Sequence, residues 1–222
     1  MSIATLSDPA PAAQPAQPPA LGPRLRLLHA RIGRAHHQAE GMAFSRALLE
    51  ERATPLQLAA LLRALAPAYT LLEQRTPPIA AALGVADAPW ATLARHEALA
   101  HDLALLSTLP AAPPSNAASD WLERLRHLAE VAPHRWMAHV YVRYGGDLSG
   151  GQQLAPRAKA ILARQGLPAL HFWEFAQPAA AMKQALHDTF ERLSLTGRQE
   201  QELLEEAEDA FHCTQRLLAE LA

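Results

Sequence analysis

Apolar residues recur at the three- and four-residue spacing of amphipathic helices through most of the chain, and no second pattern competes with it. The spacing is clear in residues 56–65, 93–106 and 121–128. Residues 140–144 alone have the β-branched and aromatic composition of a strand. Because a lone strand has no partner to pair with, we expect this segment to be helical too. The sequence therefore predicts an all-α fold, a single domain of about eight helices.

Several residues mark where these helices begin and end. Proline is tolerated in the first helical turn, and five prolines stand at candidate starts, at positions 23, 55, 89, 133 and 178. Thr54 precedes one of them. Thr196 and Gln199 have the spacing of a capping box, which predicts a last helix that runs to about Leu221. The first long helix is expected over residues 24–44.

Residues 1–20 differ in composition from the rest of the chain. They are mostly Ala, Pro, Gln and Ser and contain no Lys or Arg, which predicts a disordered Pro/Ala-rich tail and leaves residues 21–222 as the folded domain. The tail lacks the basic start and apolar run of a secretory signal and the arginines of a mitochondrial transit peptide. We expect no membrane span, since no apolar stretch approaches about 20 residues.

Charge and cysteine content narrow the expected partners and compartment. The net charge is −2 with histidine neutral, which gives no reason to expect nucleic-acid binding. Cys213 is the only cysteine, so no intrachain disulfide can form. This composition fits a reducing compartment, and we expect a cytoplasmic protein.

The first helix carries two adjacent histidines that point in different directions. At about 100° per residue, His36 falls about 40° from the centre of the apolar face, and His37 about 140° away from it. Considered alone, His36 is more often a buried histidine with a satisfied hydrogen bond than a metal ligand. A ligand also needs an acceptor near its second ring nitrogen, and Glu40 follows one turn later.

Four glycines within seven residues form the second informative feature, at positions 145, 146, 150 and 151. Each costs about 1 kcal/mol relative to alanine inside a helix, so the cluster indicates a turn, a kink or a close approach of bare backbone to a ligand. A phosphate-binding loop would require a lysine after the second glycine, and Gly151 and Gln152 stand there instead. A plain turn between helices and a bent helix facing a flat ligand both remain open.

Other catalytic patterns are missing from the sequence. No glutamate has a histidine three residues later, as di-iron carboxylate bundles require. The run that begins at His96 lacks the second histidine of the zinc-protease motif H-E-x-x-H, and no G-x-S-x-G motif is present.

The glycine cluster and the histidine pair together resemble one family. Residues 141–152, YVRYGGDLSGGQ, closely resemble the signature of the heme oxygenases, and residues 36–40, HHQAE, with Phe44 after them, resemble that family's iron-ligand helix. The resemblance covers residues 21–222. It implies an all-α fold with heme between a proximal and a distal helix, and a bacterial, biliverdin-producing member of the family.

The resemblance also implies roles for individual residues. His36 corresponds to the proximal iron ligand. Asp147, Tyr69 and Arg143 correspond to a hydrogen-bond network that organises water near bound O₂. Seven further positions are expected to contact heme: Gly146, Gly150, Gly151, Lys183, Tyr141, His29 and His187.

Some positions depart from the family pattern. His29 and His187 stand where basic propionate partners are typical, Gly145 replaces a bulky apolar residue, and Thr214 stands in place of an asparagine. If these two histidines titrate near their reference pKa, lowering the pH through about 6.5 strengthens their pairing with propionates.

The expected function is the oxidative cleavage of heme by O₂ to biliverdin, CO and Fe²⁺. Heme is then substrate and cofactor at once, and electrons come from a ferredoxin, a flavodoxin or a reductase. A phytochrome is one conceivable bilin acceptor. The alternatives are a heme carrier or sensor on the same fold without turnover, and a helical interaction module, which would leave the glycine cluster unexplained.

Overall fold

The computed structural model describes residues 21–222, and this part of the chain folds into ten α-helices without a strand. Residues 1–20, for which a disordered tail is predicted, lie outside the described residues. The helices in chain order are α1 (Pro23–Glu40), α2 (Ala43–Leu49), α3 (Pro55–Ala82), α4 (Trp90–Leu93), α5 (His96–Leu105), α6 (Asn116–Val131), α7 (Pro133–Asp147), α8 (Gly150–Ala163), α9 (Ala179–Arg192) and α10 (Gly197–Ala219).

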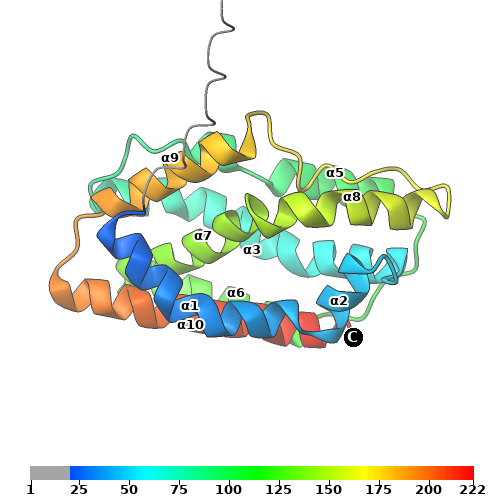
Figure 1. Ribbon diagram of the computed structural model, residues 1–222, viewed down its shortest axis with the longest axis horizontal. Coiled ribbons are helices and arrows are strands. Elements are labelled where there is room, and N and C mark those ends of the chain that lie inside the picture. Colours follow the sequence, from blue (N-terminus) through cyan, green and yellow to red (C-terminus); the bar gives the residue numbers. More distant parts are fainter. Residues whose placement is uncertain (1–20) are drawn as a thin grey trace, which may run out of the picture.

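Helix α7 lies at the centre of the arrangement (Figure 1). It packs against α10 on one side and against α3 and α6 on another. Helix α1 runs alongside α10, while α8 continues from the end of α7 across the middle of the molecule. Residues 140–144 belong to α7, so the helical interpretation is correct despite their strand propensity. The burial of most of α7 lets packing outweigh that propensity.

The predicted helix starts agree with the structure. Thr54 and Thr196 each form a complete capping box, with Gln57 and Gln199 respectively. Pro23, Pro55 and Pro133 stand in the first turn of their helices, and the other two predicted prolines occupy N-caps. These local signals define helix boundaries because they satisfy backbone groups that a helix end leaves free.

The prediction of one helix over residues 24–44 is wrong at its C-terminal end. Helix α1 ends at Glu40, and Met42 adopts an extended conformation before α2 starts at Ala43. Residues 93–106 are likewise interrupted, by Ala94 and Arg95 between α4 and α5. These two breaks produce short helices and account for ten helices where about eight were expected.

Helix α3 also differs from the prediction that no stretch of the chain is long and apolar enough to span a membrane. It is long and apolar enough to cross a membrane by length and composition, although no such stretch was predicted. This is only weak evidence for a membrane span, because buried core helices of other proteins meet the same criteria of length and composition. Here α3 packs against α5, α6 and α7, and buried residues such as Leu58, Leu62 and Tyr69 lie along it. Its position in the core accounts for its apolar character.

Candidate functional site

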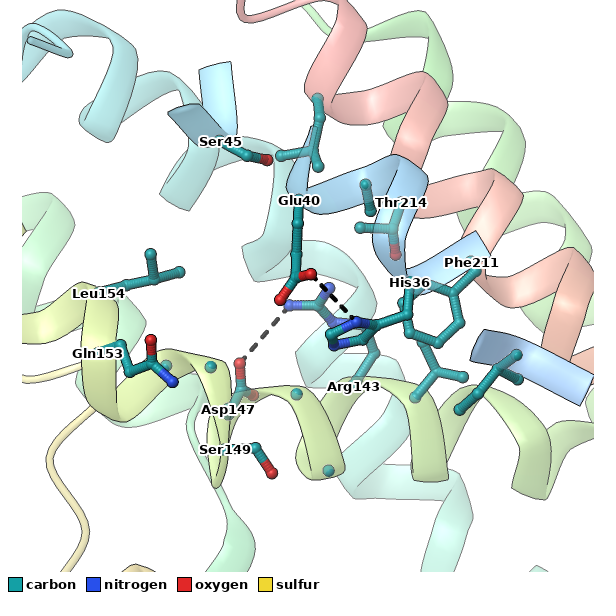
Figure 2. A pocket seen from close by; sticks show the side chains of 18 of the residues that line it. His36, Glu40, Ser45, Arg143, Asp147, Ser149, Gln153, Leu154, Phe211 and Thr214 are labelled. Atoms are coloured by element: carbon teal, nitrogen blue, oxygen red, sulfur yellow. Dashed lines mark ion pairs between the residues drawn. The ribbon is translucent and has the colours of Figure 1, made fainter. Parts of the chain in front are cut away.

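A cavity of about 530 Å³ lies between α1 on one side and the junction of α7 and α8 on the other. Side chains of α2, α3, α6, α9 and α10 and of the loop after α8 complete its lining. Figure 2 shows His36 and Glu40 entering from α1, Asp147 from the α7–α8 side, and Phe211 and Thr214 from α10. A volume of this size falls within the range of about 300–1,000 Å³ that is typical of sites for small molecules and cofactors.

His36 lies on the α1 wall of this cavity and His37 does not. The His36 side chain is 52% exposed, and its ring meets Phe211 edge-on at 5.7 Å between centroids. The His37 side chain is 85% exposed. The two histidines therefore point in the directions that helical spacing predicts. The Glu40 carboxylate lies 3.6 Å from His36 Nδ1 and 3.4 Å from His37 Nδ1, so it neighbours both rings.

The opposite wall is built from bare backbone. Helix α7 ends at Asp147, α8 begins at Gly150, and Leu148 and Ser149 form the bend between them. A Cβ atom added at Gly145, Gly146 or Gly150 would meet nothing within 4 Å. All three line the cavity, so the missing side chains leave room for a flat ligand to approach the main chain.

Gly151 has a different reason to be glycine. A Cβ atom there would lie 2.5 Å from Cδ1 of Trp173, so the absence of a side chain is required by packing within the protein. Gln152 strengthens the same junction, because its amide donates to the main-chain oxygens of Asp147 and Trp173. Gly151 also lines the cavity, but its contact with Trp173 was not expected.

Three polar residues meet behind the glycine wall. The Tyr69 hydroxyl donates a short hydrogen bond to Oδ2 of Asp147. Arg143 donates to the Tyr69 oxygen from Nε at 3.2 Å and from Nη2 at 3.1 Å, and its Nη2 lies 3.6 Å from Asp147 Oδ1. Asp147 and Arg143 line the cavity, whereas Tyr69 lies behind Asp147 and does not. The resemblance assigns these three residues to one network, and Tyr69 reaches the cavity only through the other two.

Burial sets the protonation behaviour of this group. It raises the pKa of Asp147, and the charge of Arg143 and the hydrogen bond from Tyr69 oppose that rise only in part. Burial also raises the pKa of Tyr69 well above its ordinary value, so the phenol keeps its proton as a donor. The Asp147 carboxyl therefore has a higher pKa than an exposed aspartate, and its neutral acid form persists to higher pH.

A second polar group occupies the end of the cavity near α9. His29 Nε2 lies 2.6 Å from the Tyr141 hydroxyl, and the His187 ring stacks on Tyr141 at 6.2 Å between centroids. Lys183 lines the cavity one turn before His187. The structure thus brings together four of the residues that the resemblance expects to contact heme.

The two histidines of this group do not have their reference pKa. Burial, followed by the charge of Lys183, lowers the pKa of His29 and lowers that of His187 to about 4. The premise that both titrate near 6.5 is therefore wrong for the ligand-free site. Both rings are neutral at pH 7, and Lys183 is the cationic member of the group.

Some lining residues gave no signal in the sequence. Phe172 and Trp173 come from the loop after α8, and they are brought to the cavity by tertiary packing, with Phe172 edge-on to Tyr69 at 5.4 Å between ring centroids.

Gly33, which was also missed, lies on the α1 wall, and a Cβ atom there would meet nothing within 4 Å. A glycine inside a predicted helix, one turn before His36, is a signal that could have identified it.

Comparison with known proteins places these features in a family context. The family model described as heme oxygenase matches residues 25–220. The chain is 30% identical over 200 residues to heme oxygenase 1 of Homo sapiens, an alignment that covers 84% of this chain and 67% of the human protein. It is 33% identical over 110 residues to a heme oxygenase of Guillardia theta, covering 49% of this chain and 46% of that protein. The chain thus spans about half to two thirds of the length of these curated relatives.

Solved structures match over nearly their full length. The heme oxygenase of Leptospira interrogans superposes with a TM-score of 0.78 at 28% identity, covering 89% of this chain and 98% of that one. Heme oxygenase-1 of the cyanobacterium Synechocystis, solved in complex with heme, gives a TM-score of 0.78 at 25% identity and covers 89% of this chain and 91% of that one.

Proposed function

Because this chain belongs to the heme oxygenase family, we propose that it uses O₂ and external electrons to convert heme to biliverdin, CO and Fe²⁺. We further propose that it is a bacterial form of the enzyme. The identity of 28% to the Leptospira structure and 25% to the Synechocystis structure supports that assignment. The single cysteine, Cys213, is free and buried, which supports a reducing, cytoplasmic location.

The observation that carries the proposal is the pairing of His36 with a bare glycine wall across one cavity. His36 offers an imidazole nitrogen from α1, and Gly146 and Gly150 face the cavity without side chains. The lining between them is largely apolar, as a porphyrin plane requires. The residues present therefore fit heme, with His36 as the axial ligand and the glycine backbone against the opposite porphyrin face.

Heme, once bound, supplies the reactivity toward O₂, and the protein contributes orientation and proton delivery. In our proposal His36 would hold the heme iron from α1 through a ring nitrogen, and the cavity wall formed by α7 and α8 would lie across from it. Lys183 and the neutral pair of His29 and Tyr141 hold the propionates and so set the rotation of the porphyrin. His187 and Gly151 support this seating through Tyr141 and Trp173 respectively.

Asp147 is the residue we propose for proton delivery. Its carboxyl faces the cavity, with Oδ2 held by Tyr69 and Oδ1 near Arg143. This fixed orientation lets Asp147 hold ordered water on the open side of the heme plane and pass a proton through it. Tyr69 is a positioning residue, since it reaches the cavity only through Asp147 and Arg143, and Arg143 lies close enough to Asp147 to balance the charge of its carboxylate.

Turnover also needs partners beyond heme. We propose an external one-electron donor, a ferredoxin, a flavodoxin or a reductase, and a bilin acceptor such as a phytochrome as one destination of the product. The competing function is a heme carrier or sensor without turnover. The buried network of Asp147, Tyr69 and Arg143 favours the enzyme, because a carrier has no use for a proton-delivering carboxyl on the open side of the heme.

Aerobic turnover of the hemin complex tests the proposal. Purified protein with one equivalent of hemin should lose its Soret band when given a reductant and air, and chromatography should show biliverdin together with released CO. A carrier would keep its Soret band under the same conditions, which would contradict the proposed activity.

Two histidine variants test the axial ligand. His36→Ala should lose the histidine-ligated spectrum and recover it in part with added imidazole. His37→Ala, whose side chain is exposed outside the cavity, should keep the wild-type spectrum. The reverse behaviour of the two variants would show that the assignment of His36 is wrong.

A further inference from the structure

We infer that the protein has a second metal site, for a divalent transition-metal ion, outside the heme cavity. Its ligands are His101 and Asp102 of α5 and His171 of the loop between α8 and α9. None of the three lines the cavity. The site is therefore separate from the proposed heme chemistry and does not depend on it.

The spacing of the ligand atoms fits a small metal ion. Nδ1 of His171 lies 3.1 Å from Asp102 Oδ1, and Nδ1 of His101 lies 3.7 Å from the same oxygen. One ligand atom from each residue lies within 4.8 Å of the others. Tetrahedral zinc with bonds of about 2.0–2.2 Å separates its ligand atoms by roughly 3.3–3.6 Å, so the two nitrogen–oxygen distances already lie within a few tenths of an ångström of the required spacing.

The carboxylate at the centre of this group is oriented in advance. Asp102 is fully buried, and it accepts hydrogen bonds from the main-chain N–H groups of His171 at 2.9 Å and Phe172 at 2.8 Å. These bonds fix the plane of the carboxylate. Ligands held by such outer hydrogen bonds bind metal more tightly than free ones.

The charge balance around Asp102 also points to a cation. Within residues 21–222, the ion-pair contacts of Asp102 are with His101 and His171, and no lysine or arginine nitrogen lies within 4.0 Å of it. A buried charge is normally paired or coordinates a metal. A divalent ion bound by the three residues would supply a positive charge beside the Asp102 carboxylate.

The accessibility and chemistry of the two rings indicate which ion would bind. The side chains of His101 and His171 are 56% and 47% exposed, and the rings lie edge to face with centroids 4.7 Å apart. An ion can therefore enter from solvent and keep water as a further ligand. Two imidazoles with one carboxylate suit zinc, iron, nickel or copper, whereas calcium and magnesium prefer oxygen ligands.

Bound metal would also stabilise one side of the cavity. Phe172 and Trp173 follow His171 directly and line the cavity, while His101 and Asp102 belong to α5. An ion held by all three ligands would tie this loop to α5. Because metal binds the folded arrangement and not the unfolded chain, it should raise the thermal unfolding midpoint.

Zinc titration of the full-length, hemin-free protein tests this site. We expect the wild type to bind one equivalent of Zn²⁺ in competition with a chromogenic chelator. His101→Gln and His171→Gln should each weaken that equivalent at least about tenfold. Co²⁺ in the wild type should give visible absorption bands, with both variants losing them. Both side chains are about half exposed, and circular dichroism checks that the variants remain folded.

The matched control is His37→Gln. His36, His37 and Glu40 form another group with metal-ligand spacing, all three exposed on α1. His37→Gln should keep the zinc equivalent and the zinc-dependent rise in unfolding midpoint. Loss of the equivalent in His37→Gln, its retention in His101→Gln and His171→Gln, or no competitive zinc binding by the wild type would each overturn the proposal.

Discussion

The pKa of the buried Asp147 carboxyl is determined by its burial and by its neighbours. Its side chain is almost completely buried, and burial alone would strongly favour the neutral acid. The hydrogen bond from Tyr69 and the nearby charge of Arg143 offset part of this rise in the pKa of Asp147. The result is a carboxyl with a raised pKa at the edge of an apolar cavity, which is the environment that general acid–base chemistry uses.

Substitution of Asp147 separates proton delivery from heme binding. Asp147→Leu should still bind hemin, because the His36 wall is untouched, but biliverdin formation in a single turnover should fall by about 10²–10⁴-fold. Asp147→Asn should retain more activity, since an amide can still hold water. Single-turnover spectra of both variants and the wild type, taken with one reductant, measure the difference. A wild-type biliverdin yield from Asp147→Leu would exclude the proton-delivery role.

The buried histidines make the stability of the hemin-free protein depend on pH. The pKa of His187 is about 4 in the folded protein, lowered by burial and by Lys183, and it is near 6.5 when unfolded. Between these values the unfolded chain binds more protons, so the free energy of unfolding should fall as the pH drops from about 6.5 toward 4. His29 and the buried His139 also have lowered pKa values and act in the same direction.

Urea unfolding at several pH values between 7 and 4.5 checks this. His187→Gln should show a shallower loss of stability with falling pH than the wild type. His37→Gln, which changes an exposed ring, should follow the wild type. Equal slopes for His187→Gln and the wild type would show that His187 is not a source of the pH dependence.

At the scale of the helices, local signals predicted the starts well and the interruptions poorly. A capping box such as Thr196 with Gln199 lies within four residues, so the sequence carries all of its information. The break after Glu40 falls at Gly41, the C-cap of α1, which is a local stop signal that apolar periodicity does not contain. The contact between Gly151 and Trp173 joins residues far apart in the chain and is decided by packing.

The same limit applies to the two candidate sites. The histidine pair on α1 and the glycine cluster were recognisable because each is contiguous in the sequence. The cluster of His101, Asp102 and His171 was not recognisable, because about 70 residues separate Asp102 from His171 in the chain. Phe172 and Trp173 were missed for the same reason. The direction of a side chain along one helix is predictable, whereas its partners from another element are not.

The glycines of α7 and α8 should respond in opposite ways to substitution. Gly146→Ala meets no neighbour and should stabilise the hemin-free protein by about 0.5–1 kcal/mol, because alanine favours a helix. It should weaken hemin binding, because its methyl group would occupy the porphyrin side of the wall. Gly151→Ala should instead destabilise the protein by about 1–3 kcal/mol through its clash with Trp173.

Urea unfolding and hemin titration of the two variants measure these effects. Tryptophan fluorescence quenching reports the hemin affinity. Hemin binding by Gly146→Ala equal to that of the wild type would contradict a close approach of porphyrin at this position. A Gly151→Ala variant as stable as the wild type would show that Trp173 moves aside easily.

At the scale of the whole molecule, the cavity lies between α1 and α8. Helix α1 packs against α2, α9 and α10, whereas α8 packs against α2, α3 and α7. A ligand that fills the cavity would contact α1 and α8 at once, through His36 on one side and the glycine wall on the other. Heme is therefore expected to act as a structural link between α1 and α8 as well as a substrate.

Hemin should accordingly stabilise the folded protein, and part of that effect should come from the bond to His36. At a free hemin concentration 1,000 times its dissociation constant, binding contributes about 4.1 kcal/mol, which raises the unfolding midpoint of a protein of this size by about 8–16 °C. Metal-free protoporphyrin fills the same cavity without an axial bond, so it should bind more weakly and stabilise less at equal concentration. In His36→Ala the two porphyrins should stabilise equally, because neither can form that bond, while His37→Ala should keep the wild-type difference. Differential scanning calorimetry of the three proteins with each porphyrin measures these shifts. If hemin stabilised His36→Ala as much as the wild type, the link between α1 and the iron would have to be formed by another residue.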